Sequence, residues 1–313
     1  MPEEFSHSLA LMGIKLITSL GFKIGQATYG KNKDLSGFTV KNSLGLAAGL
    51  DKNGDYIDNF AKLGFGFLEI GTVTPRPQPG NKKPRLFRLK NSKAIVNRMG
   101  FNNKGVDYLI KKLQQRKSDV PLGISIGKNF DTPNDLAYKD YLFCLERVYE
   151  FSDYVAVNIS SPNTRNLREL EAEKELNSLI SKLKSRQIEL TKVFGYRPLF
   201  VKISPDNDKR TLELICRTLI DNSVDGLICS NTTIKHDYYS GKGGLSGKPL
   251  MDSSTEALKL SRKFLGKDFP IIACGGVMSY EDYDKKIESG ADLVQIYTGF
   301  IYEGPKLIDD ILN

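Results

Sequence analysis

Eight short apolar runs with polar punctuation recur along this chain of 313 residues, and amphipathic segments with helical spacing lie between most of them. Uninterrupted apolar strands that alternate with helices are typical of a parallel sheet covered on both faces. Eight such units in a chain of this length predict an α/β fold of the (β/α)8 TIM-barrel type. The predicted strands are residues 43–50, 67–74, 122–127, 154–160, 199–204, 226–231, 271–277 and 293–300.

Two further elements are predicted outside these units. After the second run, residues 84–101 alternate around the turn sequence KNS, which indicates an inserted β-hairpin above the barrel. Residues 4–22 form one amphipathic helix, which either caps the barrel or lies on a membrane surface. Its apolar face carries Phe5, Leu9, Met12, Leu16 and Leu20. The chain is therefore divided into a short N-terminal helical segment, residues 1–36, and a barrel domain, residues 37–313.

The composition argues against several classes of function. The net charge of +8 is spread along the chain rather than gathered in one block, so no nucleic-acid partner is predicted. The four cysteines lie far apart and form no C-x-x-C pair, and no metal site is predicted. No run of about 18 apolar residues is present, so no transmembrane helix is expected.

Polar residues follow several of the predicted strands, at the barrel face where active sites of this fold lie. The fourth strand leads into SSPNT, which is either ordinary turn chemistry or a loop that presents Ser161 as a reactive group. Lys202 lies inside the fifth apolar run, and a buried lysine there implies an anionic partner.

Glycines follow the last two predicted strands, in CGGV at residues 274–277 and YTGF at residues 297–300. Barrels of this type often bind a phosphate group at that position. A phosphate there, with the Lys202 charge near the middle of the rim, suits a flavin mononucleotide (FMN) whose ring lies across the barrel mouth. The glycines alone also permit a phosphate-binding lyase or isomerase without flavin.

From about residue 38 to its end, the sequence resembles the dihydroorotate dehydrogenases of the membrane-associated class that uses a quinone. The motifs that carry the resemblance are GLAAGLDKNG, EIGTVTPRPQPGNKKPRLFRL, NRMGFNN, GKNFDTP, VNISSPNT, VKISPD, NTT, GGLSGKPL and QIYTGFIYEGP, in order and correctly spaced. The resemblance implies oxidation of (S)-dihydroorotate to orotate in pyrimidine biosynthesis, with FMN as cofactor and a quinone of the ubiquinone or menaquinone type as second oxidant.

Matching positions of the family imply a role for individual residues. The implied flavin contacts are Ala48, Gly49, Thr72, Ser125, Asn158, Lys202, Ser230, Gly247, Gly276, Tyr297 and Thr298. The implied substrate contacts are Lys52, Asn97, Met99, Gly100, Phe101, Asn158, Asn163, Asn231 and Thr232. Ser161 matches the catalytic base, whose proton leaves toward Thr164 or a water under Phe101. The family usually has Asn and Thr where Ser125 and Ser230 stand, and each replacement keeps a hydrogen-bonding side chain but changes its reach.

The only histidines, His7 and His236, lie away from the predicted strand ends, which does not support a serine–histidine triad. In the resembling class the N-terminal helix lies on the bilayer and forms the mouth of a quinone tunnel. That class has further residues before this helix, and the short start is either native or trimmed. We expect a peripheral protein on the cytoplasmic face of a bacterial inner membrane, with a trimmed protein of the mitochondrial inner membrane as alternative. The nearest alternative function is another FMN-dependent barrel oxidoreductase with a soluble acceptor.

Overall fold

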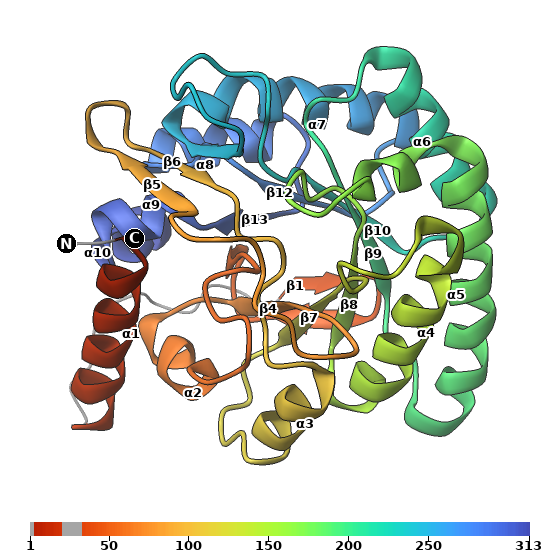
Figure 1. Ribbon diagram of the computed structural model, residues 1–313, viewed down its shortest axis with the longest axis horizontal. Helices are drawn as coiled ribbons and strands as arrows, with labels where there is room; N and C mark the ends of the chain where they lie inside the picture. Colours follow the sequence, from red (N-terminus) through yellow and green to blue (C-terminus); the bar gives the residue numbers. More distant parts are fainter. Residues whose placement is uncertain (1–2, 21–32) are drawn as a thin grey trace.

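The structure, a computed structural model, describes residues 3–20 and 33–313, and its centre is a closed barrel of eight parallel strands (Figure 1). Each barrel strand lies within one of the eight predicted ranges, so the predicted TIM barrel is confirmed. In order around the barrel, the strands are β3 (Leu44–Leu46), β4 (Phe67–Val73), β7 (Leu122–Ile126), β8 (Tyr154–Asn158), β9 (Leu199–Ile203), β10 (Gly226–Cys229), β12 (Ile271–Cys274) and β13 (Leu293–Ile296).

Helices surround the barrel and bury their apolar faces against it (Figure 1). In α6 the buried residues recur at helical spacing, and the Asp208 side chain caps the first turn by accepting from Thr211 N at 2.8 Å. The helices around the barrel are α2 (Ile57–Phe60), α3 (Val106–Gln114), α4 (Ala137–Val148), α5 (Glu173–Phe194), α6 (Lys209–Asp221), α7 (Met251–Leu265), α8 (Tyr280–Glu288), α9 (Thr298–Glu303) and α10 (Lys306–Leu312). Short 3-10 helices are η1 (Ala61–Leu63), η2 (Lys90–Ser92), η3 (Asn134–Leu136), η4 (Tyr149–Phe151), η5 (Leu167–Glu171) and η6 (Lys248–Leu250).

Aromatic rings fill the amino-terminal end of the barrel, because each of three rings lies beside a glycine on the neighbouring strand. A Cβ atom at any of these glycines would lie 2.0–2.3 Å from the ring, so only glycine leaves the space. The pairs are Gly45 with Phe67, Gly123 with Tyr154 and Gly226 with Phe200. This end of the barrel is therefore a packed core, and a ligand has room only at the opposite end.

A small hairpin that the sequence analysis did not predict closes the filled end. It consists of β1 (Lys33–Leu35) and β2 (Phe38–Val40), and the Phe38 ring lies 4.9 Å from the Tyr154 ring, centroid to centroid. The turn of this hairpin contains residues 36 and 37, the expected boundary between the two segments of the chain.

A three-stranded antiparallel sheet, which we call the roof sheet, is inserted outside the barrel. Strands β5 (Leu86–Leu89) and β6 (Ala94–Asn97) form the predicted hairpin. The third strand, β11 (Gly244–Gly247), pairs with β6 and was not predicted. Gly247 has a φ of 95°, and a Cβ there would lie 2.3 Å from the Lys93 carbonyl oxygen, so this close approach requires glycine.

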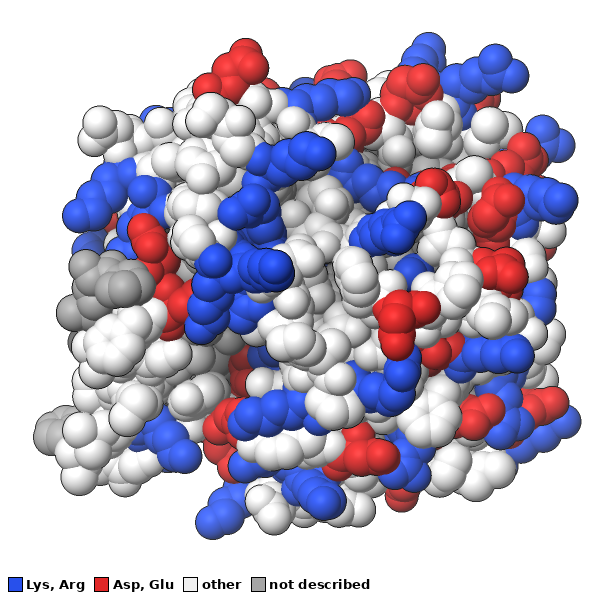
Figure 2. Space-filling model, viewed as in Figure 1, with Lys and Arg blue, Asp and Glu red and all other residues white. Residues whose placement is uncertain are grey.

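The predicted N-terminal helix is α1 (Glu3–Ser19), and the last two residues of its predicted range lie outside the described residues. Leu11 is buried, Glu4 pairs with Lys83 at 2.8 Å, and Thr18 Oγ1 accepts from Asn59 at 2.7 Å. These contacts attach one side of α1 to the rest of the protein, whereas its apolar face points toward solvent. Figure 2 shows few charged side chains along that face. Its exposed residues are Phe5, Leu9, Met12, Leu16 and Leu20, each 51–66% exposed. Within residues 3–20 and 33–313, no helix is both long and apolar enough to cross a bilayer.

Candidate active site

A cavity opens at the carboxyl ends of the barrel strands, beside the roof sheet, and encloses about 1020 Å³ including space open to solvent. Apart from Ser125 and Thr164, all the candidate residues of the sequence analysis line it. They are Ala48, Gly49, Lys52, Thr72, Asn97, Met99, Gly100, Phe101, Asn158, Ser161, Asn163, Lys202, Ser230, Asn231, Thr232, Gly247, Gly276, Tyr297 and Thr298.

On the side of the cavity formed by the ends of β12 and β13, the backbone passes very close to the start of α7. Gly276 has a φ of 89°, and a Cβ at this position would lie 2.3 Å from Met251 Cα at the start of α7. Thr298 lies opposite, where its hydroxyl donates to Ser246 Oγ at 2.8 Å. Only glycine therefore lets the chain at residue 276 pass so close to α7, and the position of Gly276 and Thr298 at the ends of β12 and β13 fits a phosphate group.

The floor of the cavity is a buried polar network around Lys202. Its Nζ lies 3.6 Å from Glu69 Oε1, so the anionic partner implied by the sequence is present within the barrel itself. Glu69 Oε2 accepts from Tyr154 OH at 3.0 Å and from Gln295 Nε2 at 2.8 Å. Burial alone would lower the pKa of Lys202, but the Glu69 carboxylate and, to a smaller extent, Cys274 together raise that pKa above its ordinary value, so Lys202 stays cationic.

Glu69 and Gln295 were missed as candidates, although each interrupts an apolar strand in the same way as Lys202. Such polar residues within buried runs were the signal that could have identified them. The second side-chain oxygen of Gln295 is buried and has no hydrogen-bond partner among the described residues. An unpaired buried acceptor beneath the cavity fits a ligand that donates a hydrogen bond.

Ser125 lies behind the cavity wall rather than in it. Its hydroxyl is 2.9 Å from Thr72 Oγ1, and Thr72 Oγ1 accepts from Asn158 Nδ2 at 2.9 Å. Thr72 and Asn158 reach the cavity and Ser125 does not, so Ser125 supports the wall by holding Thr72.

Ser161 is buried in the loop after β8, where its Oγ accepts from Asn163 N at 3.4 Å. Thr164 lies outside the cavity lining, and its Oγ1 is buried with no partner among the described residues. Phe101 covers the same side with a φ of 53°, and its carbonyl accepts from Asn103 Nδ2 at 2.7 Å. No histidine is among the described residues that line the cavity, so no triad base is available to Ser161.

Amide side chains from the ends of β6 and β8 and from the loops after β8 and β10 converge on the same region. Asn163 Nδ2 donates to Asn97 Oδ1 at 3.0 Å, and Asn231 Nδ2 lies 3.3 Å from Asn158 Oδ1. Thr232 Oγ1 is buried and has no partner among the described residues. The arrangement offers both donors and acceptors to a planar polar ring.

Lys52 provides the positive charge on the α1 side of the cavity, and its Nζ donates to the Gly49 carbonyl at 2.7 Å. Burial and, to a smaller extent, the nearby Arg85 charge lower the pKa of Lys52 to about 8. An anion beside Lys52 would relieve this desolvation, which makes the position suitable for a carboxylate.

A second cavity lies between α1, the roof sheet and α9. It shares Lys52, Met99 and Tyr297 with the first cavity, so these side chains form a common wall. The rest of its lining is mostly apolar, including Leu11, Ile14, Leu50, Leu86, Ile95, Phe300 and Ile301.

Comparisons with known proteins agree with one another. The family model described as "Dihydroorotate dehydrogenase" matches residues 32–313. A protein of Aliivibrio salmonicida named dihydroorotate dehydrogenase (quinone) is 47% identical over 99% of this chain and 95% of its own length. One of the same name from Shewanella sp. is 49% identical over 100% and 95%. The DHODH of Eimeria tenella in complex with ferulenol superposes with a TM-score of 0.90, at 35% identity over 98% of this chain and 89% of that one. This chain therefore belongs to the dihydroorotate dehydrogenase family.

Proposed function

We propose that this protein oxidises (S)-dihydroorotate to orotate in pyrimidine biosynthesis and passes the electrons to a quinone. The observation that carries the proposal is that one cavity contains both groups of residues that the reaction needs. It brings Ser161, Lys52 and four asparagines (Asn97, Asn158, Asn163 and Asn231) together with the glycine cradle, formed by Gly276 and Thr298 at the ends of β12 and β13. The relatives named dihydroorotate dehydrogenase (quinone), which this chain matches over almost its full length, support the same activity.

The cofactor that fits the cavity is FMN. Gly276 and Thr298 would hold its phosphate, and Lys202 and Gln295 would contact its ring. The chemistry that FMN supplies when bound is acceptance of a hydride from the substrate and delivery of two electrons to the quinone. Lys202 would supply a fixed positive charge to this cofactor, and Thr72 and Asn158 would supply hydrogen-bonding groups at the cavity wall.

The substrate is held by charge at one end and by amides around its ring. Lys52 forms a charge-assisted bond with the carboxylate, and Asn97, Asn163 and Asn231 pair with the ring N–H and C=O groups. Ser161 takes the proton from one ring carbon while the hydride leaves the neighbouring carbon. From Ser161 the proton leaves toward a water or toward Thr164, whose buried hydroxyl lacks a partner among the described residues and would pass a proton on to solvent. Orientation and exclusion of water carry much of the rate, since an alcohol is a weak base.

The second cavity would hold the quinone, because its mostly apolar lining suits a ring with an isoprenoid tail. The segment of residues 1–36 serves as the membrane-contact unit, and residues 37–313 serve as the catalytic barrel. The exposed face of α1 then lies on the cytoplasmic surface of a bacterial inner membrane, with its apolar side chains at the acyl boundary.

Replacing both Leu9 and Leu16 with serine is expected to lower binding to lipid vesicles by at least about tenfold, because each leucine contributes roughly 1.5–3 kcal/mol when buried in the bilayer. Turnover with a soluble dye acceptor should stay normal, since both side chains point away from the barrel. Vesicle sedimentation measures the binding. The matched control is replacement of Ile188 and Val193, which are 61% and 71% exposed on α5, and which should leave vesicle binding unchanged. Equal vesicle binding by both double variants would show that α1 does not contact the membrane.

An anaerobic titration of the purified protein with dihydroorotate tests the proposed activity. We expect the oxidised flavin band, near roughly 450 nm, to bleach and to recover on addition of a ubiquinone analogue. Bleaching without recovery by the quinone would favour a soluble acceptor. A yellow protein that does not bleach would contradict the assigned substrate, and a colourless protein that cannot be reconstituted with FMN would contradict the cofactor.

A further inference from the structure

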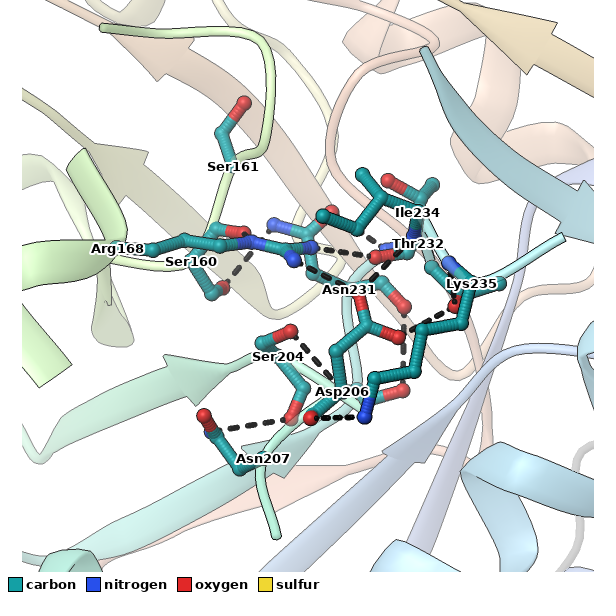
Figure 3. A network of polar contacts seen from close by, with 12 residues as sticks. Ser160, Ser161, Arg168, Ser204, Asp206, Asn207, Asn231, Thr232, Ile234 and Lys235 are labelled. Carbon is teal, nitrogen blue, oxygen red and sulfur yellow. Dashed lines mark hydrogen bonds and ion pairs between the residues drawn. The ribbon is translucent and has the colours of Figure 1, made fainter. Parts of the chain in front are cut away.

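One arginine links the three loops that follow β8, β9 and β10, and it does so from outside the cavity lining (Figure 3). Arg168 lies in η5, and each of its three nitrogens donates to a different loop. Its Nε donates to the Ser160 carbonyl at 3.0 Å, its Nη1 to Asp206 Oδ2 at 2.7 Å, and its Nη2 to the Thr232 carbonyl at 2.9 Å. The planar guanidinium therefore fixes the relative positions of all three loops.

Asp206 completes this connection from the loop after β9. Its Oδ1 accepts from the Thr233 hydroxyl and its Oδ2 accepts from Ile234 N at 2.9 Å. Its own carbonyl accepts from Lys235 Nζ at 2.7 Å (Figure 3). Asp206 thus holds both Arg168 and the chain immediately after Thr232.

The backbone carbonyls that accept from Arg168 belong to residues in or next to the cavity lining. Ser160 directly precedes Ser161, and Thr232 itself lines the cavity. A second contact joins the loops after β8 and β10 without the arginine, since Asn231 Nδ2 donates to Ser160 Oγ at 3.1 Å. Together these bonds set the separation between the base and the residues that hold the substrate ring.

The burial of the pair separates it from an ordinary surface ion pair, which contributes little. The side chains of Arg168 and Asp206 are only 20% and 9% exposed, although neither touches the cavity. Loss of the arginine would leave the Asp206 carboxylate without its cation and the two carbonyls without their shared donor. The loops on either side of the substrate would then be free to shift relative to each other.

We propose that Arg168, held by Asp206, is a positioning residue that places Ser161 against the substrate bound at Asn231 and Thr232. The inference rests on the proposed function, because it assumes that Ser161 is the base. A displacement of about 1 Å in a reacting group costs about 100-fold in rate, whereas binding through Lys52 and the other asparagines is affected much less. The geometry of the reaction, rather than substrate affinity, is what this ion pair maintains.

The test is the rate of flavin bleaching by dihydroorotate under anaerobic conditions, measured by stopped flow in the holoenzyme. We expect Arg168→Gln to slow bleaching by about 10- to 100-fold while orotate affinity changes by less than about threefold. Asp206→Asn, which keeps the shape of the side chain, should lower the rate by a smaller factor, and Arg168→Lys should restore part of it. The matched control is Arg186→Gln, which removes an arginine from an ion pair on α5 away from the cavity and should change neither quantity.

A double-mutant cycle separates positioning from a general structural role. In the Ser161→Ala background, Arg168→Gln should lower the bleaching rate by less than about twofold, because the hydroxyl that Arg168 positions is already missing. An undiminished effect in that background would overturn the inference, as would an unchanged bleaching rate in Arg168→Gln or a loss of orotate affinity as large as the loss of rate. Failure of the proposed function is seen separately, as a wild-type flavin that dihydroorotate does not bleach.

Discussion

Replacing Ser161 with alanine is expected to slow dihydroorotate oxidation by about 100- to 10,000-fold, the range that a positioned general base contributes. The cavity wall should stay intact, because among the described residues the Ser161 hydroxyl makes a single long hydrogen bond, 3.4 Å from Asn163 N. Flavin content and orotate affinity should therefore match those of the wild type. Stopped-flow bleaching gives the rate, and absorbance titration with orotate gives the affinity.

Two companion variants make this test specific to proton transfer. Ser161→Cys should show a rate that rises as pH passes roughly 8.5, the ordinary pKa of a thiol, since the thiolate is the stronger base. Thr164→Val should lower the rate less than Ser161→Ala does, because water replaces the buried hydroxyl as proton acceptor. Near-normal turnover in Ser161→Ala would remove this residue from the mechanism.

Replacing Lys52 with alanine is expected to weaken orotate binding by roughly 10- to 150-fold, which corresponds to about 1.5–3 kcal/mol for a hydrogen bond to a charged group. FMN affinity should change little, because Lys52 lies on the wall shared with the second cavity and away from the glycine cradle. Fluorescence titrations of holoenzyme with orotate and of apoprotein with FMN measure the two constants. Lys174→Ala, which removes an exposed lysine on α5, is the charge-matched control.

The pH dependence of orotate binding gives a second, independent measure of Lys52. Because the pKa of Lys52 is lowered to about 8, the cation that binds the carboxylate is present below that pH and is lost above it. Orotate affinity should be constant below about pH 7 and fall by up to about tenfold per pH unit above pH 8. The decline should be absent in Lys52→Ala. A wild-type affinity that does not change between about pH 7 and 9.5 would contradict the role of this charge.

The barrel could be predicted from the sequence because each of its strands is buried on both faces and therefore reads as an apolar run. The β1–β2 hairpin and β11 gave no such signal. Each strand of that hairpin has three residues, and β11 has the glycine-rich sequence GLSG. Strand β11 is extended because β6 lies beside it, 147 positions away in the chain from Gly244 to Asn97, and periodicity within one segment cannot report a partner so distant.

The candidate site was predictable to the extent that strand ends meet at one face of a barrel. Glu69 was missed because its role depends on Lys202, Tyr154 and Gln295, which come from three other strands. Ser125 is the converse case. Its place in the chain suggested a flavin contact, whereas its hydroxyl lies 2.9 Å from Thr72 Oγ1 and supports a residue that lines the cavity.

The roof sheet has a consequence for how the protein reaches its active form. Pairing of β6 with β11 joins residues 94–97 to residues 244–247, so it closes a long loop of chain and cannot form before residue 247 has been synthesised. The cavity residues Asn97, Ser246 and Gly247 are carried by this pairing. A chain emerging from the ribosome therefore exposes an incomplete ligand site until nearly all of it has been synthesised, and acquisition of the cofactor is a late step in maturation.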